Sequence, residues 1–334
     1  MYSACSGKFQ SPINIDMKDV LHVKLPPLRF EGFDEELEDA ILTNNGHTVM
    51  VSPKDEDSDD VKVKGGPLKG AYVFKQMHFH WGMNDSLGSE DSINNQSFPM
   101  ELHMVFWKES YGSYEKAIEH KDGLTVMAFF YEITMNTNKA YKPLISALEE
   151  VKGNHSNKHM EDLPALKKLL PQDRVHYYYY QGSLTTPPCD EIVTWIDFTE
   201  SIPLSPDQVN QFRRIMDQNH RPTQPVGERT IWFNVGPGEL IMPYQQESSA
   251  TTAASNKLSS LKDCKEIIKI SYFQLSIFGW NILSILAVGI LITLKRNLRN
   301  GMLNPSPSHE YATVPRNNAT KPIFSSLKQL PALA

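Results

Sequence analysis

The chain has 334 residues, of which 40% are hydrophobic and 22% charged, and its formal net charge is −6. Six Lys or Arg residues against one Glu give residues 295–334 a charge of +5, so the rest of the chain carries −11. An acidic body with a basic tail argues against a nucleic-acid-binding domain, which would carry its positive charge on the folded part. Three cysteines exclude a disulfide-dense scaffold, and their number alone does not establish a pairing.

Residues 1–244 are expected to form one β-dominated domain with peripheral helices. Short apolar runs alternate with turn signals such as Asn45-Gly46 and Gly65-Gly66-Pro67, a pattern that predicts many short strands. Ser205 followed by Pro206 is typical of a helix N-cap and first helical position. The pattern predicts strands over 71–81, 101–107, 124–132, 175–181 and 192–197, and helices over 141–151, 163–170 and 205–217.

The composition changes after residue 244. Residues 245–270 are rich in Ser, Thr, Ala and Asn, which predicts a flexible linker. A transmembrane helix is predicted over 271–294, because residues 273–294 carry no charge and span roughly 30 Å at 1.5 Å per residue, the thickness of a hydrocarbon core. Lys and Arg residues follow at once, which predicts a cytosolic tail over 295–334 and an outside location for the large domain.

The N-terminus does not fit this topology. The first ten residues contain neither the charged segment nor the apolar segment of a secretory signal peptide. We therefore expect either that the chain is N-terminally truncated or that the membrane helix inserts as an internal signal.

The strand predicted over 71–81 carries two histidines with metal-ligand spacing. Residues two apart in a strand share a face, so His78 and His80 point together while Met77 and Phe79 face the other side. Two imidazoles on one face can serve as a pair of zinc ligands. Taken alone, this short motif more often marks a pair of surface or hydrogen-bonded histidines.

A third histidine, His103, lies in the next predicted strand and shares its face with Glu101. If the two strands are antiparallel neighbours, three imidazoles converge and leave one tetrahedral position for water, as in catalytic zinc sites. Gln76 and Glu101 are each two residues from a histidine on the same face. They are therefore predicted to accept the remaining imidazole N–H groups.

Ten short motifs occur in order along the chain. On these motifs, residues 5–235 resemble the alpha-class carbonic anhydrases, and the linker with its hydrophobic segment resembles the membrane-bound extracellular members. The motifs are QSPINI (10–15), NNGH (44–47), KGGPL (64–68), HFHWG (78–82), GSE (88–90), ELH (101–103), DGL (122–124), GSLTTPPC (182–189), VTW (193–195) and RPTQP (221–225).

The resemblance implies a single domain built on a large, mostly antiparallel, twisted central sheet. It also implies an enzyme that uses Zn2+ to catalyse the reversible hydration of CO2 to bicarbonate and a proton at the outer face of the plasma membrane. The zinc ligands that it implies are His78, His80 and His103.

The resemblance assigns further residues to the reaction. His47 is similar to the family's proton shuttle, and Thr185, next to Thr186, is similar to the threonine that orients the zinc-bound hydroxide. Glu90 resembles the carboxylate partner of that threonine. Taken alone, these residues are also consistent with ordinary turn and surface positions. The residues that match the apolar wall for CO2, or simply a hydrophobic core, are Val105, Val126, Leu184, Val193 and Trp195.

Cys5 and Cys189 occupy positions that are paired as a disulfide in extracellular members of the family. Cys264 precedes the predicted membrane helix and could be free, palmitoylated or paired between two chains, so a homodimer is possible. The candidate N-glycosylation sites are Asn84, Asn95 and Asn154.

Two other functions are consistent with the same fold. One is an acatalytic carbonic-anhydrase-like binding module at the cell surface, and the other is an adhesion or receptor ectodomain. Acatalytic relatives lose at least one of the zinc-binding histidines, whereas all three are present here together with Glu90 and Thr185. The sequence therefore favours the enzyme.

Overall fold

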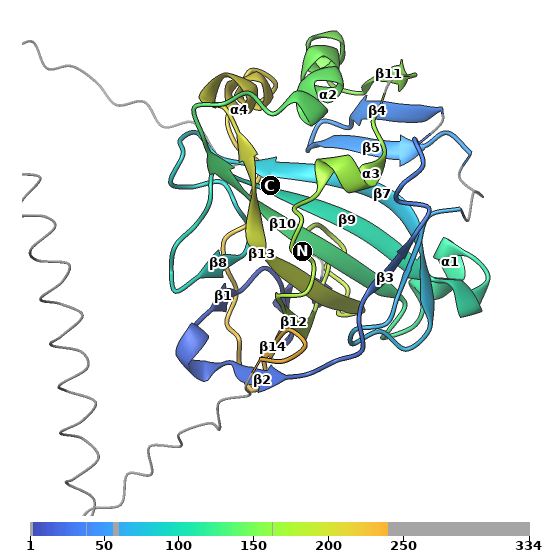
Figure 1. Ribbon diagram of the computed structural model, residues 1–334, viewed down its shortest axis with the longest axis vertical. Helices are drawn as coiled ribbons and strands as arrows, with labels where there is room; N and C mark the ends of the chain where they lie inside the picture. Colours follow the sequence, from blue (N-terminus) through green and yellow to red (C-terminus); the bar gives the residue numbers. More distant parts are fainter. Residues whose placement is uncertain (1–2, 38, 56–59, 162, 240–334) are drawn as a thin grey trace, which may run out of the picture. The chain divides into compact units, whose positions relative to one another are not determined.

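The computed structural model describes residues 3–37, 39–55, 60–161 and 163–239 (Figure 1). These residues form a β-dominated domain. The predicted linker, membrane helix and tail over 245–334 lie outside the described residues. Within the part that is described, no helix is long and apolar enough to cross a membrane.

A mixed sheet of 12 strands runs through the whole domain, with a separate pair, β1 (Asn14–Ile15) and β8 (Ser92–Ile93), at its side. Two neighbouring pairs in the large sheet, β10–β13 and β14–β2, are parallel, and the other pairs described are antiparallel. The strands in spatial order are β11 (Ser156–Met160), β4 (Ala40–Asn44), β5 (Val49–Pro53), β7 (Ala71–Trp81), β9 (Met100–Lys108), β10 (Leu124–Ile133), β13 (Val193–Leu204), β12 (Tyr177–Gly182), β14 (Trp232–Asn234) and β2 (Leu21–Val23), with β6 (Lys62–Lys64) on β7 and β3 (Arg29–Glu31) on β6.

All five predicted strands are present, and β7 has the predicted bounds. The largest difference is at β13, which was predicted to end at Asp197 and continues to Leu204. Its second half contains an exposed Glu200 and a proline, Pro203, which weaken the strand signal although Ile202 and Leu204 are apolar and buried. It is a strand because it pairs in parallel with β10 as far as Leu204, and such pairing is decided by tertiary structure.

The helices are short and lie at the periphery of the sheet: α1 (Tyr114–Ala117), α2 (Lys142–Ala147), α3 (Leu166–Leu169) and α4 (Pro206–Arg213) (Figure 1). Ser205 caps α4 as predicted, and its hydroxyl accepts from the Gln208 N–H while the Gln208 side chain accepts from the Ser205 N–H. The helix predicted over 163–170 is reduced to α3. Pro164 and Pro171 flank it, and a proline disfavours helical geometry in the residue before it.

The two faces of β7 have different surroundings, as the alternation in its sequence predicted. Met77, Phe79 and Trp81 are buried in the larger hydrophobic core, where Phe79 and Trp81 pack against Phe212 of α4. A second, smaller core on the opposite face contains Val126 and Trp195 among others. The histidines of β7 lie on this second face.

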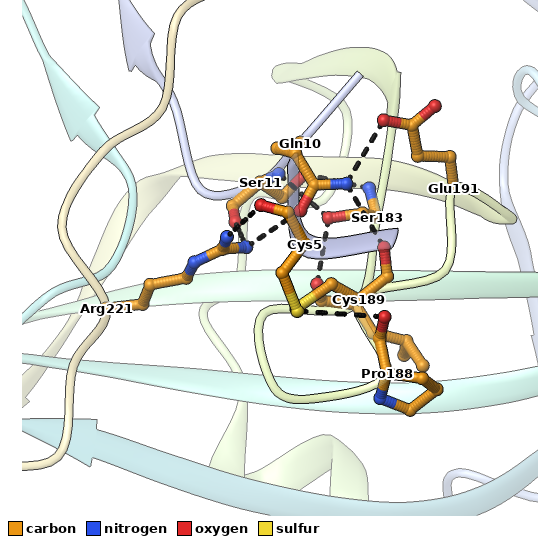
Figure 2. Close-up of a disulfide and its surroundings, with 9 residues drawn as sticks. Cys5, Gln10, Ser11, Ser183, Pro188, Cys189, Glu191 and Arg221 are labelled. Carbon is orange, nitrogen blue, oxygen red and sulfur yellow. Dashed lines mark hydrogen bonds between the residues drawn. A yellow bond between two sulfur atoms is a disulfide. The ribbon is translucent and has the colours of Figure 1, made fainter. Parts of the chain in front are cut away.

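The disulfide between Cys5 and Cys189 is present (Figure 2). Around it, the Ser11 N–H donates to the Ser183 hydroxyl at 2.9 Å, and the Gln10 amide donates to the Cys189 carbonyl at 3.1 Å. The Arg221 guanidinium donates to the carbonyls of Cys5 and Ser11. These contacts hold the N-terminal segment against residues 183–191.

One buried carboxyl group on β13 has no hydrogen-bond partner among the residues that the structure describes. Asp197 is 0% exposed, and neither of its carboxyl oxygens forms a hydrogen bond within the described residues. Burial raises the pKa of Asp197 well above its ordinary value, and the nearby carboxyl groups of Asp91 and Glu101 raise it further. Asp197 is therefore protonated in the folded protein at pH values where an exposed Asp is ionised.

Removal of the disulfide should destabilise the domain. We expect Cys189→Ser to lower the free energy of unfolding by roughly 2–5 kcal/mol, because the cross-link restricts a long loop in the unfolded chain. Urea denaturation with and without reductant measures this. Reductant should lower the free energy of unfolding of the wild type to that of the variant, and it should leave the value for the variant unchanged. Equal stability of the two oxidised proteins would contradict the prediction.

The substitution Asp197→Asn should remove a loss of folding stability that grows as the pH rises. In the unfolded chain Asp197 ionises near pH 4, whereas the folded protein keeps it protonated to higher pH. The stability of the wild type is therefore lost as pH rises from about 4 through the raised folded pKa, by up to about 1.4 kcal/mol per pH unit. The Asn variant lacks this loss, so its advantage in urea denaturation should widen between pH 5 and pH 8.

Asp217→Asn, at an exposed carboxyl group, is the matched control and should leave the pH dependence of stability unchanged. An advantage of Asp197→Asn that is constant with pH would show that Asp197 does not keep its proton in the folded state.

Candidate metal centre

Three imidazoles from two neighbouring strands meet on the face of the smaller core. Strands β7 and β9 are antiparallel, and their register places His78 directly opposite His103. The ring centroids of His78, His80 and His103 lie 4.5–5.2 Å apart. One ring nitrogen from each residue lies within 4.8 Å of the other two. His80 and His103 are buried, and His78 is half-buried.

Gln76 and Glu101, the two predicted acceptors, each bind the ring nitrogen of a histidine that points away from the cluster. The His78 Nδ1–H donates to Gln76 Oε1 at 2.9 Å, and the His103 Nε2–H donates to Glu101 Oε1 at 2.6 Å. In a neutral imidazole the other nitrogen then has a free lone pair. The partners therefore leave His78 Nε2 and His103 Nδ1 as the acceptor atoms.

The acceptor for the third ring is a backbone carbonyl that the sequence did not indicate. The His80 Nδ1–H donates to the Asn219 carbonyl at 3.1 Å, which leaves His80 Nε2 as the acceptor atom. The Asn219 side chain is itself fixed, because it accepts from the Trp81 N–H and donates to the carbonyls of Phe79 and His47. A backbone carbonyl has no residue-type signal, so no motif could have found this contact.

The histidines are neutral in this environment. Burial lowers the pKa of His103 to about 4. Burial also lowers the pKa of His80, and it lowers that of His78 well below its ordinary value, with a further contribution from the neighbouring imidazoles. The neutral ring is the form that coordinates metal ions.

Glu90 is buried beside the histidines. One of its carboxyl oxygens is hydrogen-bonded, and the other lies close to two of the imidazole rings. Its Oε1 accepts from the Arg221 backbone N–H at 2.7 Å. Its Oε2 lies 3.4 Å from His80 Nε2 and 3.9 Å from His103 Nδ1. Glu90 Oε2 and His80 Nε2 are both buried and neither has a hydrogen-bond partner. Since buried polar atoms are nearly always paired, both atoms are available to a further group that binds beside them.

Glu101 connects His103 to the backbone of Glu90 and Asp91. It is 0% exposed, and its Oε2 accepts the backbone N–H groups of Glu90 and Asp91 at 2.8 and 2.9 Å. Burial and the neighbouring Glu90 raise the pKa of Glu101 to about 8, while the two backbone donors lower it. A positive charge at the histidines would favour the ionised form further.

The two predicted threonines lie on the loop that follows β12. Thr185 is half-buried and Thr186 is exposed, and the Cys189 N–H donates to the Thr186 carbonyl at 2.9 Å to close the turn. The described residues contain no hydrogen bond between the Thr185 hydroxyl and Glu90. The predicted pairing of these two side chains stays a prediction.

His47 lies on the turn between β4 and β5, and its side chain is exposed. Its N–H donates to Asn45 Oδ1 at 2.9 Å, and its carbonyl accepts from the Asn219 side chain at 3.1 Å. Because the Asn219 carbonyl also holds His80, one residue connects the backbone of the predicted shuttle to the histidine cluster.

The predicted apolar wall is assembled beside His103. The Trp195 ring lies edge-to-face with the His103 ring at 4.8 Å, and its Nε1–H donates to the Ser183 carbonyl. Cross-strand pairing of Val126 with both Val105 and Trp195 places the wall on the histidine face. Val105, Val126, Val193 and Trp195 are buried in the smaller core, and Leu184 packs against it.

Comparison with known proteins points to one family. The model of the eukaryotic-type carbonic anhydrases matches residues 1–235. Carbonic anhydrase 7 of Mus musculus is 39% identical over 244 residues, which cover 69% of this chain and 90% of that protein. Carbonic anhydrase 4 of Oryctolagus cuniculus is 35% identical over 250 residues, or 71% and 79% of the two chains.

Carbonic anhydrase 6 of Mus musculus is 35% identical over 249 residues, which cover 70% of this chain and 75% of that protein. The matched region contains all three histidines of the cluster and both carboxylates beside it. The chain belongs to the eukaryotic-type carbonic anhydrase family and is an enzyme of that family.

Proposed function

We propose that the protein is a zinc-dependent enzyme that converts CO2 and water reversibly into bicarbonate and a proton, with His78, His80 and His103 as the zinc ligands. The observation that carries this proposal is the geometry of the three imidazoles. Each has its outer N–H held by an acceptor and its other nitrogen turned towards the same point.

The donor set suits zinc. Three neutral imidazole nitrogens with an open fourth position are typical of catalytic zinc sites, and the unpaired His80 Nε2 requires a partner of this kind. A zinc ion bound there supplies a Lewis acid that lowers the pKa of water to about 7, the value established for carbonic anhydrases themselves. Gln76, Glu101 and the Asn219 carbonyl orient the rings that hold it.

Thr185 and Glu90 are proposed to orient the reacting oxygen. A hydroxyl group has a single donor, so a Thr185 that donates to Glu90 Oε2 can only accept from the water that reacts. The unpaired Glu90 Oε2 supports this assignment. We assign the Thr185 N–H to the stabilisation of bicarbonate, with Thr186 next to it on the same loop.

The remaining assignments concern CO2 and the proton. The apolar side chains at Val105, Val126, Leu184, Val193 and Trp195 are proposed to hold CO2, which offers no hydrogen-bond donor. The exposed His47 imidazole is proposed to take up a proton through bridging waters and to release it to buffer, since imidazoles titrate near neutrality.

We propose further that the catalytic domain (1–244) lies outside the plasma membrane. The linker (245–270), transmembrane helix (271–294) and cytosolic tail (295–334) would then anchor it to the lipid bilayer. The uncharged run at 273–294 and the Lys and Arg residues directly after it support this topology. The Cys5–Cys189 disulfide supports it too, because such bonds persist in oxidising compartments.

The same location would allow N-glycosylation. Asn84, Asn95 and Asn154 are all exposed, as an acceptor asparagine must be. The pairing of two chains through the membrane helix or Cys264 stays a prediction.

His103→Ala should abolish both metal binding and activity. We expect the wild type to hold one zinc per chain and to hydrate CO2 in stopped-flow measurements, and the variant to lose more than about 100-fold of that rate, because two ligands bind zinc poorly. His120→Ala, which removes an exposed imidazole stacked on Tyr111, is the matched control. A zinc-loaded wild type that does not hydrate CO2 would disprove the proposed function.

Glu101→Gln should weaken zinc binding without removing a ligand. The substitution removes the negative charge that Glu101 would carry beside a bound zinc ion and that would make His103 a stronger ligand, and we expect zinc affinity to fall about 10–100-fold. Competition with a chromophoric chelator measures the affinity, and a thermal melt confirms that the variant folds. Glu132→Gln, at an exposed position on β10, is the control. Equal affinity of the Glu101 variant and the wild type would refute this role.

A further inference from the structure

A second exposed imidazole lies beside the turn that carries His47. His155 precedes β11 and has a φ of +61°, a left-handed conformation that is uncommon outside glycine but that histidine adopts more readily than most residues. Its ring is packed over Gly46, where an added Cβ would lie 3.6 Å from both Cε1 and Nε2 of His155. The unusual backbone conformation therefore coincides with a ring placed against the residue that precedes His47.

Strand pairing brings these two turns together. Strand β11 is antiparallel to β4, with Ser156 opposite Asn44, so the turn before β11 lies beside the turn after β4. Since successive Cα atoms are about 3.8 Å apart, the His155 ring lies within about 9 Å of the His47 Cα. The side chains of His47 and His155 therefore lie on neighbouring turns, where water molecules can connect two exposed imidazoles.

The charged groups around His155 are paired with one another. On its own turn and strand, Lys152 pairs with Glu149, and Lys158 pairs with Glu150. Farther along β11, His159 pairs with Asp39. Neither His47 nor His155 has an ion-pair partner within the described residues, so both rings are open to water.

We propose that His155 is a second station of the proton path, which receives protons from His47 through water and passes them to buffer. The proposal rests on the proposed function. Protonated His47 gives its N–H proton to a bridging water, and that water gives one of its own protons to the free ring nitrogen of His155. Protonated His155 then protonates a buffer base, and both rings return to the neutral state.

The test uses the full zinc-loaded chain. In dilute buffer, where proton exit limits turnover, we expect His155→Asn to lower kcat about two- to fivefold, because His47 still reaches solvent directly. The ratio kcat/KM should not change, since it reports the conversion of CO2 before the proton leaves. Concentrated imidazole buffer should restore kcat to the wild-type value.

The substitution to asparagine separates the effect of losing the imidazole from any effect on the backbone of the turn. Asparagine tolerates a left-handed φ, so His155→Asn keeps the backbone conformation, and His155→Ala should show the same loss if the imidazole alone matters. His159→Ala removes another exposed imidazole from β11 and should keep the wild-type kcat in dilute buffer.

Two results would overturn the relay. One is a wild-type kcat for His155→Asn in dilute buffer, and the other is a deficit that concentrated buffer does not correct. If the wild type hydrates CO2 and either result is found, only the relay fails. If the zinc-loaded wild type is inactive, the proposed function fails and the relay fails with it.

Discussion

The register between β7 and β9 is the constraint on which the site depends. Two histidines two residues apart on β7 share a face, and antiparallel pairing places His103 directly opposite His78. A slip of one residue would turn the β9 histidine to the larger core and separate the three rings. Phe79 and Trp81 prevent such a slip, because they are buried among aromatic side chains on the other face.

The same register also places the groups that orient the rings. Gln76 and Glu101 are each two residues from a histidine, so the pleat that aligns the histidines aligns their acceptors as well. Glu101 also accepts the backbone N–H groups of Glu90 and Asp91, so the same side chain orients His103 and holds the segment that carries Glu90. A buried carboxylate at Glu101 is costly, and these two donors offset part of that cost.

The loop with Thr185 depends on long-range contacts instead. It lacks regular secondary structure, and the N-terminal segment holds it through the Cys5–Cys189 disulfide and the hydrogen bond from Ser11 to Ser183. Arg221 supports both parts, because its side chain binds the N-terminal segment and its backbone N–H binds Glu90. Segments more than 170 residues apart therefore hold the loop that carries Thr185 in place.

The sequence by itself determined the local features: the bounds of β7, the shared face of His78 and His80, the capped start of α4 and the acceptors Gln76 and Glu101. Each follows from a period of two residues or from a cap whose side chain signals its role. Only the tertiary structure decided the Asn219 contact to His80, the unpaired carboxyl of Asp197 and the place of His155 over Gly46. These depend on which strands are neighbours and on backbone carbonyls that look alike at every residue, so no local pattern contains them.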